Sequence, residues 1–322
     1  MSRKPPQNAP EGERIAKVMA RAGLCSRREA EAWIAAGRVA VNGERLTSPA
    51  FNVGPRDAVA VDGKPLLARE RTRLFRYHKP RGLVTTARDP EGRPTVFARL
   101  PKNLPRLVSV GRLDLTSEGL LLLTNDGGLK RALELPETGW LRRYRVRANG
   151  KVTQDRLDGL RHGVKVEGVS YGPVDAKLDR AQGANVWLTI GMREGKNREI
   201  RKVLGSLGLT VNRLIRVSYG PFQLLELEAG EIEEVNTRTL REQISEKIAR
   251  AAGVDFDAPL RESEPKVERT VPKKPETASP ARPARPSAPP PAAREKPKRR
   301  PLRKPANRRG GPRGSHFGSK KR

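Results

Sequence analysis

The first apolar positions along the chain recur with helical spacing, at Ile15, Val18, Met19 and Ala22. They predict an amphipathic helix over residues 13–22. The segment Ser26–Glu29 has the residue types and spacing of a capping box, so a second helix is expected from residue 27. This helix should end at Ala36, because Gly37 follows it.

Alternating apolar residues and turn-forming dipeptides come next, at Arg38–Val41, Asn42–Gly43, Ala58–Val61 and Asp62–Gly63. Asn-Gly and Asp-Gly beside alternating segments are strong hairpin signals. We therefore expect a small domain of two helices and a sheet over residues 13–66. A disordered segment at 1–12 should precede it, and a charged linker at 67–73 should follow it.

A second domain is expected over residues 74–250. Strands are predicted at Leu74–His78, Tyr144–Ala148, Asn185–Ile190, Leu209–Tyr219 and Phe222–Leu227, and two segments alternate weakly, Val164–Val166 and Ala176–Leu178. Helices are predicted at Leu129–Leu135, Val152–Leu160, Arg198–Leu207 and 231–251. Because strands and helices do not alternate regularly, the pattern favours an α+β fold with a mixed, mainly antiparallel sheet over a Rossmann fold.

Leu120–Leu123 is an uninterrupted apolar run between turn formers. A run this short predicts a buried strand or the start of a buried helix. It supports the preceding loop, which carries Asp114 behind Arg112. A lone aspartate in such a loop either caps a turn or pairs with the arginine, or it is a catalytic group fixed by a rigid element.

The composition adds a polyanionic partner to this picture. The chain has 322 residues, a formal net charge of +30 and 35% apolar residues. From about residue 255 apolar residues become rare, and prolines, lysines and arginines dominate. We interpret residues 251–322 as a disordered basic tail that binds nucleic acid non-specifically, the alternative being a tail that only confers solubility.

Several classes of protein are disfavoured by the sequence. There is one cysteine, Cys25, and there are three histidines, so we expect no disulfide and no metal site. Phosphate-binding and dinucleotide-binding glycine loops, zinc-deaminase motifs and a paired-metal acidic cluster are absent. With no apolar run long enough to span a bilayer and no signal-peptide core, a cytoplasmic protein is expected.

These exclusions permit a rearrangement that needs no cofactor. Detaching uracil from its ribose and rejoining it through carbon requires a carboxylate nucleophile, a cation that keeps the carboxylate ionised, and a group that removes the C5 proton. An aromatic surface should hold the base outside the stack. The composition permits this chemistry without selecting it.

The first domain resembles a known RNA-binding module. The stretch ERIAKVMARAGLCSRREAEAWIAAGRVAVNGERLTSPAFNV, followed by VDGKPL, is similar to the small RNA-binding domain of ribosomal small-subunit protein four. The resemblance implies that its basic second helix and following strand contact structured RNA. The arginines that we assign to this contact are Arg21, Arg27, Arg28 and Arg38.

The second domain resembles the RsuA/RluB group of rRNA pseudouridine synthases. GRLDLTSEGLLLLTNDG is similar to the nucleophile motif, and HKPRGLVTT, RDPEGRPTVFARLP, RRYRV and REGKNREIRKVLGSLGLTVNRLIRVSYGPFQL follow the family's order. The resemblance implies that Asp114 is the nucleophile, that Tyr144 stacks on the base or removes its proton, and that Arg201 forms an ion pair with Asp114. Where the family commonly has lysine before the tyrosine, this chain has Arg142, to which we assign no catalytic role.

Further RNA contacts are expected at Arg93, Arg112, Lys196, Arg198 and Lys202. DPEGRPTV and GKNREIRK resemble the large-subunit branch more than the small-subunit one, so a 23S rRNA uridine is the expected target. The alternatives are a 16S rRNA enzyme, a non-catalytic RNA-binding or ribosome-assembly factor that has kept the fold, or an RNA chaperone that acts mainly through its tail. We expect a monomer that acts on rRNA or pre-ribosomal particles without cofactor, metal or membrane.

Overall fold

The structure is a computed structural model and describes residues 12–260. The expectations for residues 1–11 and for the tail beyond residue 260 lie outside the described residues. The first domain contains β1 (Glu13–Arg14), α1 (Ile15–Arg21), α2 (Arg27–Ala35), β2 (Val39–Val41), β3 (Glu44–Arg45), β4 (Asn52–Val53), β5 (Val59–Val61) and β6 (Lys64–Pro65).

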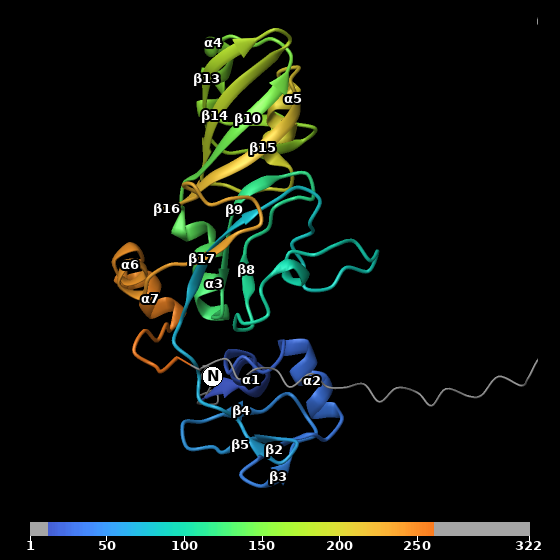
Figure 1. The fold of residues 1–322 in the computed structure, drawn as a ribbon, viewed down its shortest axis with the longest axis vertical. Helices are drawn as coiled ribbons and strands as arrows, with labels where there is room; N and C mark the ends of the chain where they lie inside the picture. The colour runs from blue at the N-terminus through green and yellow to red at the C-terminus, as the bar shows by residue number, and fades with distance from the viewer. Residues whose placement is uncertain (1–11, 261–322) are drawn as a thin grey trace, which may run out of the picture. The chain divides into compact units, whose positions relative to one another are not determined.

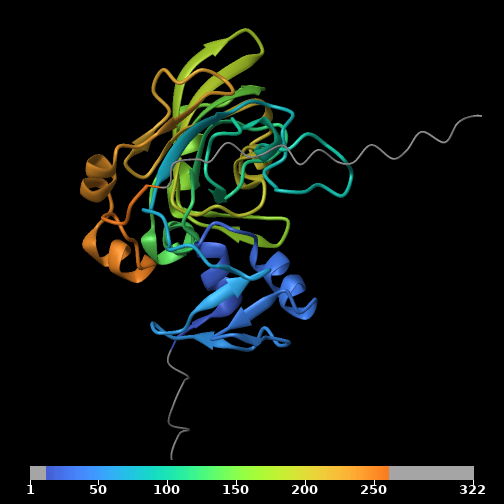
Figure 2. The same cartoon turned by 60° about the horizontal axis from the view of Figure 1, so that its bottom comes forward.

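The capping box predicted for α2 is present. The Glu29 amide donates to Ser26 Oγ at 3.1 Å, and the Ser26 amide donates to Glu29 Oε2 at 2.8 Å. The first helix begins two residues later than predicted, because Glu13–Arg14 is extended and pairs with β4. Both helices pack on one face of the sheet β3-β2-β5-β6 around Ile15, Met19 and Ile34 (Figure 2).

The second domain is built on a nine-stranded sheet (Figure 1). Its main path runs β13-β14-β10-β15-β9-β7-β17, with β8 beside β9 and β16 beside β15. The strands are β7 (Leu74–Lys79), β8 (Val108–Val110), β9 (Glu118–Thr124), β10 (Arg142–Asn149), β13 (Val174–Gln182), β14 (Asn185–Met192), β15 (Thr210–Tyr219), β16 (Phe222–Gln223) and β17 (Ile232–Glu234). All pairs are antiparallel except β15 with β9, which confirms the expected α+β fold with a mainly antiparallel sheet.

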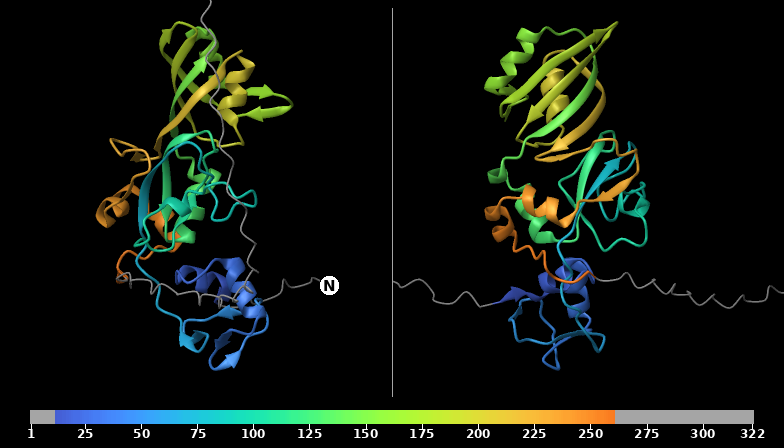
Figure 3. Two further views of the ribbon diagram at one scale, coloured as in Figure 1. Left: turned by 45° about the vertical axis from the view of Figure 1, so that its right-hand side comes forward. Right: turned by 60° about the vertical axis from the view of Figure 1, so that its left-hand side comes forward.

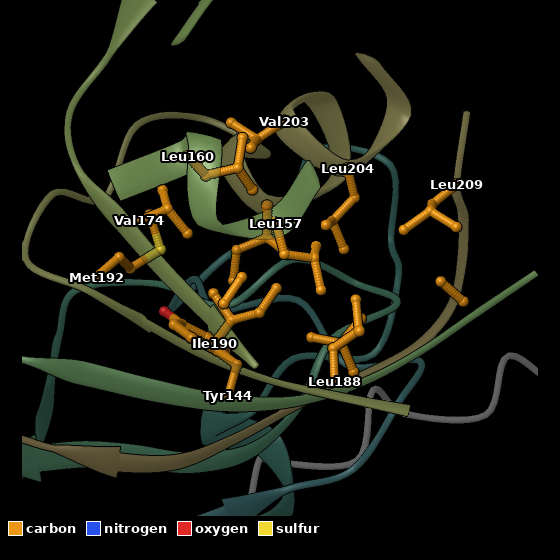
Figure 4. Packing of buried hydrophobic residues seen from close by; sticks show 14 of the residues in the cluster. Tyr144, Leu157, Leu160, Val174, Leu188, Ile190, Met192, Val203, Leu204 and Leu209 are labelled. Carbon is orange, nitrogen blue, oxygen red and sulfur yellow. The ribbon is translucent and has the colours of Figure 1, made fainter. Parts of the chain in front are cut away.

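Helices and short strands cover this sheet. They are η1 (Phe97–Arg99), α3 (Gly127–Glu134), η2 (Pro136–Thr138), α4 (Gln154–Asp158), η3 (Gly159–His162), β11 (Val164–Val166), β12 (Val169–Tyr171), α5 (Glu199–Ser206), α6 (Thr237–Gln243) and α7 (Glu246–Ala252). The helices α4 and α5 lie on the same face of the strands β13, β14, β10 and β15 (Figures 1 and 3). Leu157 and Leu204 from these helices enclose an apolar core with Leu188 and Ile190 (Figure 4).

The leucine run forms the strand β9, with apolar contacts on both faces. Leu120 and Leu122 pack with α3 and Tyr219, whereas Leu121 and Leu123 face the opposite way and pack with Phe75. Because both faces are covered, the run shows no alternation in the sequence.

Gly119 lets β9 and β15 come close together at the centre of the sheet. Its φ is +98°, and a Cβ at this position would lie 2.3 Å from the backbone oxygen of Arg216. Such a distance is far below van der Waals contact, so a glycine is required here. The close approach brings the loop that carries Asp114 next to β15.

The C-terminal part of the second domain differs from the prediction. Residues 231–251 do not form one helix, because β17 pairs with the edge strand β7 before α6 and α7 follow. Residues 251–260, which the predicted tail included, are part of the fold: Phe256 packs on the core, and the Thr72 amide donates to Asp255 O at 2.7 Å. Within residues 12–260, no helix is long and apolar enough to cross a membrane.

Candidate active site

The loop that carries Asp114 is fixed by backbone hydrogen bonds. The Ser117 amide donates to Asp114 O at 3.0 Å, which closes a tight turn. From the loop after β7, the Gly82 amide donates to Leu115 O at 2.8 Å and Thr85 Oγ1 donates to Leu113 O at 2.9 Å. Asp114 is therefore held from both sides, as preorganised catalysis requires.

Lys79, at the end of β7, also holds the Asp114 loop in place, and this contact was not predicted from the sequence. Its side chain is 0% exposed, and Nζ donates to Ser117 O at 2.9 Å and to Pro80 O at 3.0 Å. Burial lowers the pKa of Lys79 to about 8, although the charges of Asp114 and Glu118 oppose this shift. Nothing in the alternation of β7 distinguishes a buried lysine from an exposed one.

Asp114 opens into a cleft of about 720 Å³. The cleft is lined by residues of the second domain, among them Thr85, Asp89, Arg93, Gly111, Arg112, Asp114, Lys130, Glu134, Arg142, Tyr144, Met192, Lys196, Arg198, Glu199, Arg216 and Tyr219. Six predicted site residues thus come together here: Arg93, Arg112, Asp114, Tyr144, Lys196 and Arg198. The Asp114 side chain is 37% exposed, so a substrate can reach its carboxylate.

The cation closest to Asp114 differs from the prediction. Arg198 Nη1 lies 4.0 Å from Asp114 Oδ2, whereas Arg201 donates to Val211 O at 2.9 Å and to Thr116 Oγ1 at 3.0 Å. The expected ion pair between Arg201 and Asp114 is therefore not formed in this structure. The reason is local: α5 begins at Glu199, and Arg198 precedes it with a φ of +51°, which turns its side chain toward the loop.

Arg201 nevertheless lies in the electrostatic field of the site. Burial lowers the pKa of its guanidinium, the neighbouring charge of Arg198 lowers it further, and the charge of Asp114 opposes both. Its hydrogen bond to Thr116 fixes the same turn that presents Asp114. A left-handed conformation at a residue other than glycine, as at Arg198, is uncommon.

Tyr144 projects from β10 toward the helices and lines the cleft beside Met192. Its side chain is 8% exposed, and Figure 4 shows it at the edge of the apolar core near Ile190. A second aromatic residue in the cleft, Tyr219, was not predicted to belong to the site. The guanidinium of Arg142 lies 4.8 Å from its ring centroid, and Arg142 Nη2 donates to Tyr219 Oη at 3.1 Å.

Two carboxyl groups meet at the start of α5. Burial raises the pKa of Glu199 to about 7, and the nearby charge of Glu194 acts in the same direction. Glu199 Oε2 accepts from the Lys196 amide at 2.7 Å, so the carboxyl group closes the loop that leads into the helix. Lys196 itself lies 2.7 Å from Glu194 Oε1 and donates to Ser170 O at 2.6 Å.

The remaining predicted RNA contacts are distributed over both domains. In the first domain Arg27 and Arg28 are exposed, Arg21 donates to Glu13 at 3.0 Å, and Arg38 is held by Asp62. The guanidinium of Arg38 also lies 4.6 Å from the Trp33 ring centroid. These arginines do not line the cleft, so no contact with the reacting base is implied for them.

In the second domain, Arg93 at the cleft is paired with Asp89 at 2.8 Å and with Glu91 at 3.0 Å. Arg112 is exposed at the cleft, whereas Lys202 lies outside it, 3.7 Å from Glu167. In the part of the chain that the structure describes, no three histidine, cysteine or acidic residues are grouped to hold a metal ion.

Comparison with known proteins identifies both domains. Residues 13–59 match the S4 domain, and residues 73–206 match the RNA pseudouridylate synthase family. An uncharacterized RNA pseudouridine synthase of Rickettsia typhi is 43% identical over 235 residues, which cover 73% of this chain and 96% of that protein. Ribosomal large subunit pseudouridine synthase B of Pasteurella multocida is 39% identical over 261 residues, 78% of this chain and 76% of the relative.

A solved structure supports the same assignment. A crystal structure of a pseudouridylate synthase covers 72% of this chain and 100% of its own, with a TM-score of 0.51 and 27% sequence identity. The resemblance found in the sequence is thus confirmed by relatives and by fold. The chain therefore belongs to the RNA pseudouridine synthase family, as a member that carries an N-terminal S4 domain.

Proposed function

We propose that this enzyme converts one uridine of 23S rRNA to pseudouridine, with Asp114 as the nucleophile. The choice of the large subunit is supported by relatives that are named ribosomal large subunit pseudouridine synthase B. The observation that carries the mechanism is the placement of Asp114: its carboxylate is accessible, its loop is fixed, and it shares one cleft with Tyr144 and Arg198.

The reaction rearranges bonds within one nucleotide. The C1′–N1 bond breaks, a C1′–C5 bond forms, the proton on C5 leaves, and N1 gains a proton, so no atom or electron enters from outside. Attack by the Asp114 carboxylate on the nucleoside divides this rearrangement into two easier steps. The base must leave the RNA stack to reach Asp114, and the cleft gives it a place to do so.

Tyr144 is the residue that we propose to contact the base. Its ring lines the cleft, and burial against Ile190 and Met192 fixes its position on β10. A ring held in this way provides a stacking surface at small cost in side-chain entropy. Its hydroxyl group is the candidate that helps to remove the C5 proton after the new bond has formed.

Two arginines have different proposed roles. Arg198, at 4.0 Å, supplies the positive charge that faces Asp114 in the open cleft. Arg201 fixes the Thr116 turn and adds its field from a more buried position. Binding energy for the rest of the RNA comes from phosphate contacts, for which Arg27 and Arg28 are exposed and available. We expect the enzyme to act as a monomer in the cytoplasm.

The test uses the purified full chain and the Asp114→Ala variant with 23S and 16S rRNA transcripts, followed by nucleoside analysis of each RNA. We expect the wild type to form pseudouridine at one 23S position, and the variant to bind the RNA equally well without forming any. Modification of 16S instead of 23S would reject the large-subunit assignment. Unchanged product with Asp114→Ala would reject the nucleophile, and RNA binding without product in the wild type would favour a non-catalytic assembly factor.

A further inference from the structure

Arg216 is a buried cation that lines the cleft. It has no role in the proposed chemistry, and none was predicted for it from the sequence. Arg216 is 3% exposed, and its Nε atom donates to Leu120 O at 2.7 Å. Its Nη2 atom is buried and has no hydrogen-bond partner within residues 12–260. A buried donor without an acceptor costs free energy, and a charged one costs more. Because Arg216 lines the cleft, a ligand bound there can supply the acceptor.

Within residues 12–260, no carboxylate forms an ion pair with Arg216. Its guanidinium lies 5.2 Å from the ring centroid of Tyr219, which gives a cation–π contact and no acceptor for Nη2. The carboxylate of Glu134, which also lines the cleft, accepts from the Gly111 amide at 2.5 Å and pairs with Lys130. The charge of Arg216 is therefore only partly compensated by the described protein.

The position of Arg216 in the sheet places it beside the base-binding tyrosine. Arg216 on β15 is the register partner of Tyr144 on β10, and both residues line the cleft. Side chains of cross-strand partners lie on the same face of a sheet and next to each other. On its other side Arg216 pairs with Gly119, five residues after Asp114. A base stacked on Tyr144 would therefore lie next to Arg216.

We infer that Arg216 donates a hydrogen bond from Nη2 to O4 of the flipped uracil and stabilises the negative charge that develops there. This inference rests on the proposed function. If Asp114 attacks C1′, the C1′–N1 electron pair stays with the uracil, whose negative charge spreads over N1, O2 and O4. If Asp114 attacks C6 instead, the electrons of the C5–C6 double bond move through C4 to O4. Both routes increase the charge on O4.

The same contact selects uracil. Cytosine carries an amino group in place of O4, and this group presents a donor to the Arg216 donor. Two donors facing each other in a buried site leave both unpaired, which is strongly unfavourable. A guanidinium that donates to the developing charge from a buried position acts as an oxyanion-hole donor does, and removing one such donor lowers the rate by about 10²–10³-fold.

The experiment measures single-turnover release of tritium from C5 of the target base, with the full chain in excess over RNA. Substrates carry uridine, 2-thiouridine or 4-thiouridine at the target position, since sulfur is a weaker acceptor than oxygen. The variants are Arg216→Gln and Arg216→Lys, the second of which keeps the charge and removes the planar fork. The control is Arg147→Gln, because Arg147 is exposed on β10 and does not line the cleft.

We expect Arg216→Gln to lower the rate on uridine by about 10²-fold, with RNA affinity and near-ultraviolet circular dichroism unchanged. In the wild type, the rate on 4-thiouridine should be at least 10-fold lower than the rate on uridine. In each Arg216 variant, the rates on 4-thiouridine and uridine should differ by less than 2-fold. Equal 4-thio effects in wild type and variants, or a rate for Arg216→Gln equal to that of Arg147→Gln, would overturn the inference. If the Arg216 substitutions abolished the effect of 2-thiouridine but not that of 4-thiouridine, the O4 assignment would be overturned. A wild type that releases no tritium from any RNA would instead reject the proposed function.

Discussion

Gly119→Ala tests how the sheet positions the catalytic groups. An added Cβ would lie 2.3 Å from the Arg216 oxygen and 2.7 Å from its nitrogen, while the closest contacts of real Cβ atoms begin near 3.0 Å. The strands β9 and β15 would have to separate by about 0.7 Å, the difference between 3.0 and 2.3 Å. Overpacking, together with the cost of a φ of +98° for alanine, predicts a loss of about 2–5 kcal/mol in unfolding free energy. Because misplacement by an ångström can lower a rate about 10²-fold, we expect a single turnover that is slower by about 10- to 100-fold.

The assay combines urea denaturation with single-turnover tritium release on the same preparations. Gly183→Ala is the matched control, since Gly183 has a φ of +59° and a Cβ added there would meet nothing within 4 Å. The control should lose only about 1–2 kcal/mol of stability and keep the wild-type rate. A Gly119→Ala protein that turned over as fast as the control would refute the claim that close strand packing sets the geometry of the site.

The charged groups of the protein provide four further predictions. Relative to Lys79→Met, the wild type should gain unfolding free energy as the pH rises from about 8 to 10.5. The reason is that the pKa of Lys79 is lowered to about 8 in the folded protein, so in this pH range the unfolded chain binds one more proton than the folded chain. Identical pH profiles of the two proteins in urea denaturation would contradict this. Relative to the wild type, Glu199→Gln should gain unfolding free energy as the pH rises from 4.5 to about 7. The reason is that the pKa of Glu199 is raised to about 7 in the folded protein, so its carboxyl group ionises at a lower pH in the unfolded chain than in the folded one. The opposite trend would show that Glu199 is ionised in the folded protein. Arg198→Gln should lower the single-turnover rate no more than about 5-fold, as expected for a half-exposed pair. Arg201→Gln should lower it by about 10²-fold, because the charge of Arg201 and its hydrogen bond to Thr116, which helps to position the Asp114 loop, are both lost; the reverse order would move the main role to Arg198. Deletion of residues 261–322 should weaken RNA affinity and reduce its salt dependence without changing the rate at saturating enzyme, and a complete loss of turnover would reject the proposed role of the tail.

The sequence predicted those elements whose signals are local. The capping box Ser26–Glu29 and the turn dipeptides of the first domain depend on neighbouring residues, and the structure contains them. The leucine run 120–123 stayed ambiguous, because the choice of strand depends on partners on both faces that lie far away in the sequence. Residues 231–251 were misassigned for the same reason: β17 exists because β7 offers an edge, and no local pattern reveals this pairing.

The same distinction between local and distant signals applies to the candidate site. Motif order was sufficient to place Asp114 and Tyr144 in one cleft. It could not decide which arginine faces Asp114, because this depends on where α5 begins and on the left-handed conformation of Arg198. Nothing in the sequence patterns of β7 and β15 marks Lys79 and Arg216 as buried, and only the arrangement of the sheet shows that both are buried beside the loop that carries Asp114.

The most direct test of the central claim is a map of pseudouridines in rRNA from cells that lack this protein, compared with the same cells carrying either the wild type or Asp114→Ala. The proposed mechanism predicts that one 23S pseudouridine disappears in the deletion strain, returns with the wild type, and remains absent with Asp114→Ala. A map that does not change on deletion, or a site restored by Asp114→Ala, would contradict it.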